Sequence, residues 1–165
     1  MVVFTRIDDR LIHGQVVEGW VNFLKANRIL VADDRVASDT LQRSIMEISV
    51  PQGIKVSIGR VDDICEQVRE TASGKDRAIL LFATPSAVVA ALKLGLQCRE
   101  LNIGGMHYIP GKRKLIDVLA VDDQDLKALR EISAHGVKVT VQAVPNQRPL
   151  PLEKLFEACR LTEKP

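Results

Sequence analysis

The chain has 165 residues, of which 46% are hydrophobic and 27% charged, and its formal net charge of +2 at pH 7 gives no indication of a nucleic-acid or membrane-surface partner. Its three cysteines include no CxxC pair, so neither a disulfide framework nor a zinc site is expected, and a reduced, cytoplasmic protein fits best. Charged residues begin at Arg6 and no apolar run approaches about 18 residues, so we expect no signal peptide and no membrane insertion.

Short apolar runs rich in β-branched residues recur along the chain. Many are apolar on both faces, which is typical of strands that are covered on both sides in a parallel sheet. These strand candidates occupy residues 2–7, 28–33, 54–59, 77–83, 100–105 and 137–144, with a weaker candidate at 114–121.

Helical patterns separate the strand candidates, at residues 14–25, 38–50, 61–70, 84–95 and 121–136. Several carry start or stop signals. Ser38 or Asp39 can cap the second helix, and Thr84 can cap the fourth, with Pro85 at its first position. His135 precedes a glycine and is interpreted as a normal helix C-terminal residue.

The alternation of strands and helices predicts an α/β fold. We expect a three-layer α/β/α sandwich with a mainly parallel, doubly wound sheet of about six to seven strands. No linker or repeat interrupts the pattern, so residues 1–165 are expected to form one domain. Residues 145–165 are predicted to be a proline-rich linker followed by a C-terminal helix.

Functional sites in open parallel sheets form beyond the carboxyl ends of the strands. The polar and glycine residues that follow the predicted strands are therefore the first candidates. They are Asp8, Asp9, Arg10 and His13 after the first strand, Thr84 after the fourth, and Gly104 and Gly105 at the end of the fifth.

His13 stands directly before Gly14, where the first helix is expected to begin. The free N–H groups and positive dipole end of a helix attract anions, above all phosphate, and Arg6 and Arg10 can add bidentate contacts. A histidine beside such a pocket can accept a phosphoryl group as a nucleophile, and an aspartate can hold its other ring nitrogen.

A plainer interpretation of the same loop remains open. Asp8 or Asp9 can cap the turn, Arg10 can be solvated, and His13 can be an ordinary polar loop residue. His107 lies in a glycine-rich loop, "NIGGMHYIPGK", which we interpret as a turn leading to a hairpin.

Phospho-aspartate receiver domains share this fold class and also use acidic residues after the first strand. They require an acceptor aspartate at the end of the third strand, where this chain has "SIGR", and a lysine after the fifth, where it has "GGMH". Asp8, Asp9, Asp33 or Asp34 could bind Mg²⁺, but carboxylates at strand ends are commonly caps or arginine partners, so no metal is expected.

Three segments together resemble the IIB component of mannose/fructose/sorbose-type sugar phosphotransferase systems. They are "RIDDRLIHGQV" at 6–16, "NIGGMHY" at 102–108 and "GVKVTVQAVP" at 136–145. The first is a highly specific motif, and the resemblance runs from residue 2 to about residue 145 with consistent element order.

The resemblance implies a phosphoryl relay. His13 would accept the group at Nδ1 from a phosphohistidine on a IIA protein, expected here to be a separate chain, and pass it to a hexose imported by the membrane subunits IIC and IID. It implies no cofactor or metal, and a cytoplasmic protein peripherally associated with the transporter. A regulatory domain that is phosphorylated without sugar transport is the alternative.

The resemblance also implies roles for the residues around the histidine. Arg10 and then Arg6 are expected to stabilise the phosphoryl group, and Gly104 and Gly105 to lie near the site. The helix start by itself makes Gly14 and Gln15 the expected phosphate-binding residues, and the strand ends place Asp8, Asp9 and Thr84 near the site.

Overall fold

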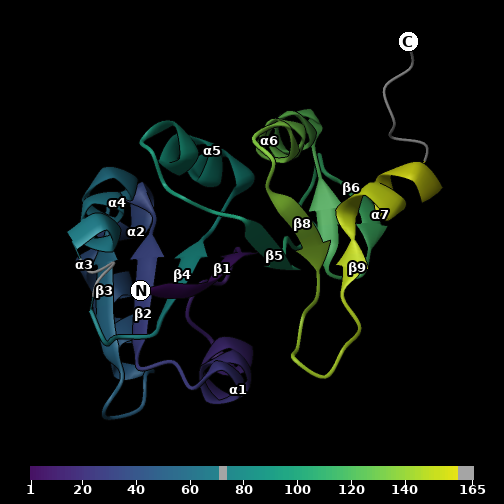
Figure 1. The fold of residues 1–165 in the computed structure, drawn as a ribbon. Coiled ribbons are helices and arrows are strands. Elements are labelled where there is room, and N and C mark those ends of the chain that lie inside the picture. The colour runs from purple at the N-terminus through teal and green to yellow at the C-terminus, as the bar shows by residue number, and fades with distance from the viewer. Residues whose placement is uncertain (71–73, 160–165) are drawn as a thin grey trace.

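A seven-stranded sheet forms the middle of the structure, a computed structural model that describes residues 1–70 and 74–159 (Figure 1). Its strand order is β3-β2-β4-β1-β5-β8-β9, and neighbouring strands are parallel except for β8 and β9. The strands are β1 (Val2–Asp8), β2 (Arg28–Ala32), β3 (Lys55–Gly59), β4 (Ala78–Phe82), β5 (Glu100–Gly105), β8 (Lys138–Val141) and β9 (Leu150–Pro151).

Helices cover both faces of this sheet. The helical segments are η1 (Gln15–Val21), α1 (Asn22–Leu24), α2 (Asp34–Ala37), α3 (Thr40–Ile48), α4 (Val61–Glu70), α5 (Pro85–Lys93), α6 (Asp123–Ala134) and α7 (Leu152–Ala158). One core cluster joins the sheet to α4, α5, α6 and α7, and a second joins it to η1, α2 and α3. The predicted α/β/α sandwich with a mainly parallel sheet is confirmed.

Local signals in the sequence set several element boundaries. The Thr84 hydroxyl accepts a hydrogen bond from the Ala87 amide and caps α5, and Asp39 caps α3 by the same type of contact with Gln42. His135 is the C-terminal cap residue of α6, as expected. Each cap satisfies an amide that would otherwise lack a partner in the first helical turn.

The helix predicted at 14–25 is present, but its first part is wound differently. Residues Gln15–Val21 form a π-helical segment that continues into α1 and ends at Lys25, whose φ is +50°. Its buried face includes Trp20, which stacks on Phe4 of β1 with ring centroids 4.3 Å apart. π-helical turns are rare and are often found at functional sites.

The prediction of a single sheet strand at 114–121 is wrong. This segment forms a separate antiparallel hairpin of β6 (Arg113–Ile116) and β7 (Leu119–Val121). β6 begins with two exposed cations, which a central strand covered on both faces would bury. The seventh strand of the main sheet is instead the short β9 in the C-terminal region.

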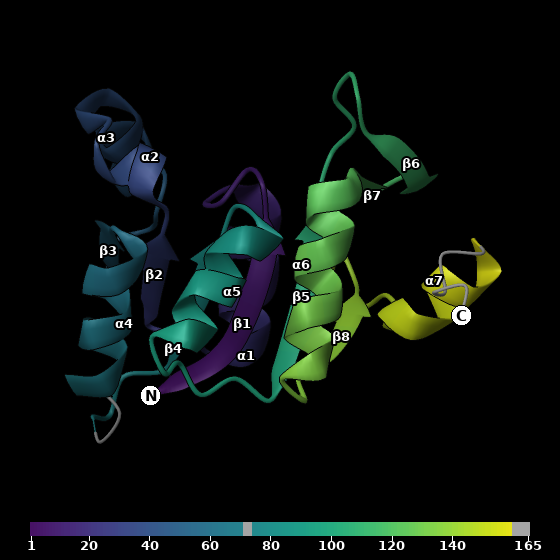
Figure 2. The same ribbon diagram turned by 90° about the horizontal axis from the view of Figure 1, so that it is seen from above.

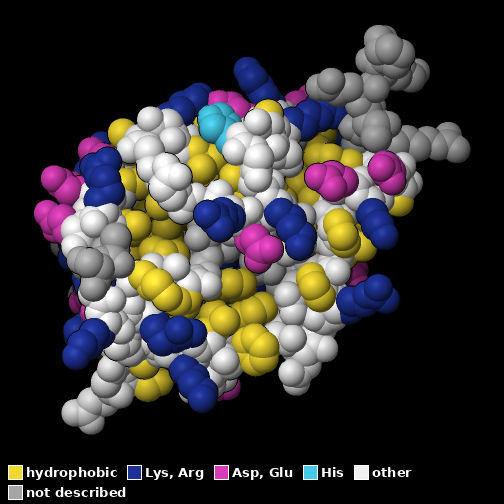
Figure 3. All heavy atoms as spheres, in the orientation of Figure 1, with side chains coloured by type: hydrophobic (Ala, Val, Ile, Leu, Met, Phe, Trp, Pro, Cys, Tyr) yellow, Lys and Arg dark blue, Asp and Glu magenta, His cyan; other side chains and the backbone are white. Residues whose placement is uncertain are grey.

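The carboxyl ends of the strands define one edge of the molecule. Figure 2 shows that α2 and α3, the loop after β1, and the β6–β7 hairpin all lie at the end opposite the N-terminus. The other end is the face seen in Figure 3, where hydrophobic side chains show between Lys and Arg side chains. None of the helices in residues 1–70 and 74–159 is long and apolar enough to cross a bilayer.

Candidate active site

Arg6 holds the carboxyl edge of the sheet together from inside. Its side chain is fully buried, and each of its five N–H groups has an oxygen acceptor. Nε and Nη2 donate to Asp8 Oδ2 at 3.2 and 2.9 Å, and Nη1 donates to Asn102 Oδ1. Nη1 and Nη2 also donate to the carbonyl oxygens of Gln142 and Ala143, at 2.9 and 3.0 Å. The residue therefore ties β1 to β5 and to the segment after β8.

The structure gives Arg6 a different role from the expected phosphate contact. Burial lowers the pKa of the Arg6 guanidinium, and the neighbouring Asp8 carboxylate opposes this effect. The guanidinium also lies 5.5 Å from the ring centroid of Trp20. Because no N–H group is left for a phosphate, Arg6 acts on the site by fixing Asp8.

The two glycines at the end of β5 leave room for these side chains. A Cβ at Gly104 would lie 1.7 Å from Arg6 Cζ, so no other residue fits against the guanidinium. A Cβ at Gly105 would lie 2.8 Å from His107 Cε1 and 3.4 Å from Asp8 Oδ1. Both glycines thus lie close to the loop of His13, as predicted, and a larger residue at either position would collide with neighbouring side chains.

The loop after β1 is fixed by backbone contacts before it reaches the histidine. The Asp9 amide donates to the Gly105 carbonyl at 3.0 Å, and the Leu11 amide donates to the Asp8 carbonyl at 2.9 Å. Leu11 has a φ of +54° and is buried in the core, an uncommon combination for a side chain with a Cβ. Such local strain is often found at functional sites.

His13 lies against the Asp8 carboxylate. Its Nε2 is 3.6 Å from Asp8 Oδ2, and its Nδ1 is 3.0 Å from the Leu11 carbonyl oxygen. Nε2 is buried without a hydrogen-bond partner among the described residues. A neutral imidazole carries one N–H, so it can donate to only one of these two oxygens at a time. The position of the proton on the ring therefore decides whether His13 donates to the Leu11 carbonyl or to the Asp8 carboxylate.

Anion-binding groups surround the exposed side of this loop. The Arg10 side chain is 44% exposed, its Nη2 donates to Gln15 Oε1 at 3.0 Å, and its Nε lies 3.6 Å from Asp8 Oδ1. The amides of Gly14 and Gln15 have no acceptor among the described residues. Free amides at a helix start next to an exposed guanidinium suit a phosphoryl group.

Asp9 and His107 form a pair that the sequence reasoning missed. Asp9 Oδ1 lies 2.6 Å from His107 Nδ1, and Asp9 Oδ2 accepts from the His107 amide at 2.6 Å. The pair connects the loop after β1 to the loop after β5. No local signal could have found it, because the two residues are 98 positions apart.

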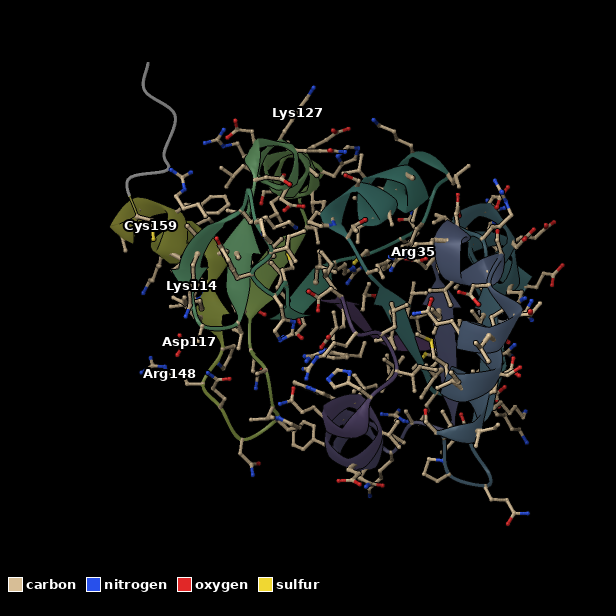
Figure 4. The ribbon with its side chains drawn as sticks, turned by 180° about the vertical axis from the view of Figure 1, so that it is seen from behind. Arg35, Lys114, Asp117, Lys127, Arg148 and Cys159 are labelled. Carbon is tan, nitrogen blue, oxygen red and sulfur yellow. The ribbon has the colours of Figure 1, made fainter. Side chains whose placement is uncertain are left out.

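Thr84 lies in a neighbouring cavity of about 630 Å³, which Asp9 and His107 also line. Arg35 lines it from α2 and is labelled in Figure 4, which shows the structure from behind. His13 is not among the lining residues. Within residues 1–70 and 74–159, no cluster of His, Cys, Asp or Glu is suited to hold a metal ion.

The cysteines are poor candidates for a nucleophile. Burial raises the pKa of the thiols of Cys65 on α4 and Cys98 before β5, which disfavours the reactive thiolate. Cys159 lies at the end of α7, far from the loop after β1 (Figures 1 and 4). The end of β3, where a receiver domain needs an aspartate, carries Gly59.

Comparison with known proteins identifies the family. The family described as "PTS system sorbose subfamily IIB component" matches residues 2–164. The chain belongs to this family. The N-acetylgalactosamine-specific phosphotransferase enzyme IIB component 2 of Escherichia coli (strain K12) is 36% identical over 155 residues, which are 94% of this chain and 98% of that protein.

Two further proteins are similar to nearly the whole of this chain. The crystal structure of the IIBSor domain of the sorbose permease from Klebsiella pneumoniae has a TM-score of 0.90 and 31% identity, with coverage of 96% of this chain and 97% of that one. The mannose-specific EIIAB component of Escherichia coli (strain K12) is 31% identical over 159 residues, which are 94% of this chain and 48% of that protein.

Gly104→Ala should lower the free energy of unfolding by roughly 3 kcal/mol or more, because the new Cβ displaces a guanidinium that is buried and fully hydrogen-bonded. Gly14→Ala is the matched control. A Cβ at Gly14 meets nothing within 4 Å and its φ is −50°, so its effect should stay within about 1 kcal/mol. Urea unfolding measures both, and equal losses in the two variants would contradict the packing described for Arg6.

Proposed function

We propose that His13 is the phosphoryl-carrying residue of this sugar phosphotransferase system IIB component. The observation that supports it most is the position of His13 at the helix start, with its buried Nε2 facing Asp8 and free amides and Arg10 beside it. Phosphoryl transfer needs mainly positioning and charge stabilisation, and this loop offers both.

The first transfer begins when the lone pair of His13 Nδ1 attacks the phosphorus of a phosphohistidine on the IIA donor. The new N–P bond forms as the donor N–P bond breaks, and the electron pair returns to the donor ring. Nδ1 must be unprotonated to attack, so the ring proton resides on Nε2. Asp8 then accepts from Nε2, and the 3.6 Å separation shortens to a hydrogen bond.

The ring also has to leave the Leu11 carbonyl before it reacts. That oxygen lies 3.0 Å from Nδ1 and occupies the direction from which phosphorus would approach. A small rotation of the ring frees Nδ1, while Asp8, held by Arg6, stays in place. Arg10 and the amides of Gly14 and Gln15 then contact the phosphoryl oxygens.

In the second transfer, a hydroxyl oxygen of the hexose attacks phosphorus. The His13 N–P bond breaks, the electron pair returns to Nδ1, and the hydroxyl proton leaves to solvent or a base. The hexose is presented by the membrane subunits IIC and IID, so the protein works on the cytoplasmic side, peripherally associated with the transporter.

Incubation with a phosphorylated IIA protein, followed by intact-mass measurement, tests the role of His13. The wild type should gain about 80 mass units, and His13→Ala should gain none. His107→Ala is the matched histidine control and should still be labelled, because His107 binds Asp9 rather than Asp8. A mass gain in His13→Ala would contradict the assignment.

Arg10→Ala should lower the rate of phosphoryl transfer to His13 by roughly 10²-fold, the usual cost of removing one donor that stabilises transition-state charge. The unfolding free energy should change little, because the side chain is half exposed. Lys25→Ala removes an exposed cation at the end of the helical segment that begins at Gln15, and it serves as the control in rapid-quench labelling. Equal transfer rates for the two variants would contradict the role of Arg10 in stabilising the phosphoryl group.

A further inference from the structure

Helix α3 carries an apolar stripe that faces away from the protein. Leu41, Ile45 and Ile48 are spaced four and three residues apart, so they share one side of the helix, and they are 71%, 59% and 84% exposed. Met46 is the one buried residue of α3. A surface helix normally turns its apolar side to the core, so an outward stripe marks a surface that another molecule covers.

The stripe lies at the edge of the molecule that carries His13. α3 follows α2, whose Asp34 and Arg35 line the cavity next to Asp9. Figure 2 shows α2 and α3 at the same end as the loop after β1. A partner that reaches His13 from this side can therefore cover α3 at the same time.

The charges around the stripe are mostly negative. On α2, α3 and the turn between them, the exposed carboxylates are Asp34, Asp39 and Glu47, and the exposed cation is Arg35. Asp34 also lies 3.8 Å from Arg60. No lysine or arginine on α3 flanks the stripe, since Arg43 is half-buried on the core side. We call this set, with Leu41, Ile45 and Ile48, the α3 surface.

This chemistry selects one kind of partner. An anionic lipid surface would repel the carboxylates, and a helix that inserts into lipid needs cations beside its apolar side. A second copy of the chain would place carboxylates against carboxylates. Membrane proteins, in contrast, carry an excess of Lys and Arg in their cytoplasmic loops.

We propose that the α3 surface docks onto basic cytoplasmic loops of the membrane-embedded acceptor subunits, with the apolar stripe at the centre of the contact and the carboxylates around it. The proposal rests on the proposed function, because it names the surface by which His13 is brought to the acceptor. Apolar contacts are typical of long-lived complexes, whereas the IIA donor is expected to bind transiently, so the α3 surface suits the membrane subunits better.

The test uses the double variant Ile45→Ser/Ile48→Ser, which should fold because both side chains are exposed. Phe23→Ser is the control, because Phe23 is 62% exposed but lies on α1, which Figure 2 shows at the end of the molecule near the N-terminus. Each protein is tested for labelling by phosphorylated IIA, for co-sedimentation with vesicles that contain IIC and IID, and for co-sedimentation with vesicles of anionic lipid alone. Light scattering gives the oligomeric state.

We expect the double variant to bind the subunit-containing vesicles roughly tenfold more weakly or worse, with normal labelling by IIA, while Phe23→Ser matches the wild type. Equal binding by the double variant overturns the proposal. So do a loss of IIA labelling without a loss of vesicle binding, wild-type binding to lipid alone, and a wild-type dimer that the double variant separates. If IIA does not label even the wild type, the proposed function itself is contradicted. The labelling measurement thus separates that failure from a failure of the docking proposal.

Discussion

The ion pair between Arg6 and Asp8 is buried, and the arrangement of the carboxyl edge depends on it. Burying a guanidinium costs several kcal/mol unless its N–H groups are satisfied. Here five hydrogen bonds to four oxygen atoms from three parts of the chain meet that requirement. The packing in turn requires a glycine at Gly104 and leaves Asp8 with a fixed orientation toward His13.

Two adjacent aspartates consequently have different roles. Asp8 points inward, where it pairs with Arg6 and faces His13, while Asp9 points to the other side and holds the loop of His107. Successive side chains at a strand end alternate in direction, so neighbouring residues can serve separate parts of the site. The exposed side of the loop after β1 thus rests on a buried, hydrogen-bonded layer, and the Arg10 side chain lies outside that layer.

Local features of the site were predictable from the sequence, and long-range contacts were not. The strand ends, the Thr84 cap and the position of His13 at a helix start follow from nearby residues. The partners of Arg6 lie up to 137 residues away, so its enclosure could not be predicted and a phosphate contact was expected instead. The exposed stripe on α3 also escaped prediction, because an amphipathic pattern does not say whether the core or a partner covers its apolar side.

The nitrogen of His13 that carries phosphorus tests the proposed function most directly, because Nε2 faces the Asp8 carboxylate and Nδ1 faces the Leu11 carbonyl. Nitrogen-15 and phosphorus-31 NMR of the phosphorylated protein can identify that nitrogen and the one that carries the proton. We predict phosphorus on Nδ1 of His13 and hydrogen on Nε2. Phosphorus on Nε2, or on any other residue, would contradict this prediction.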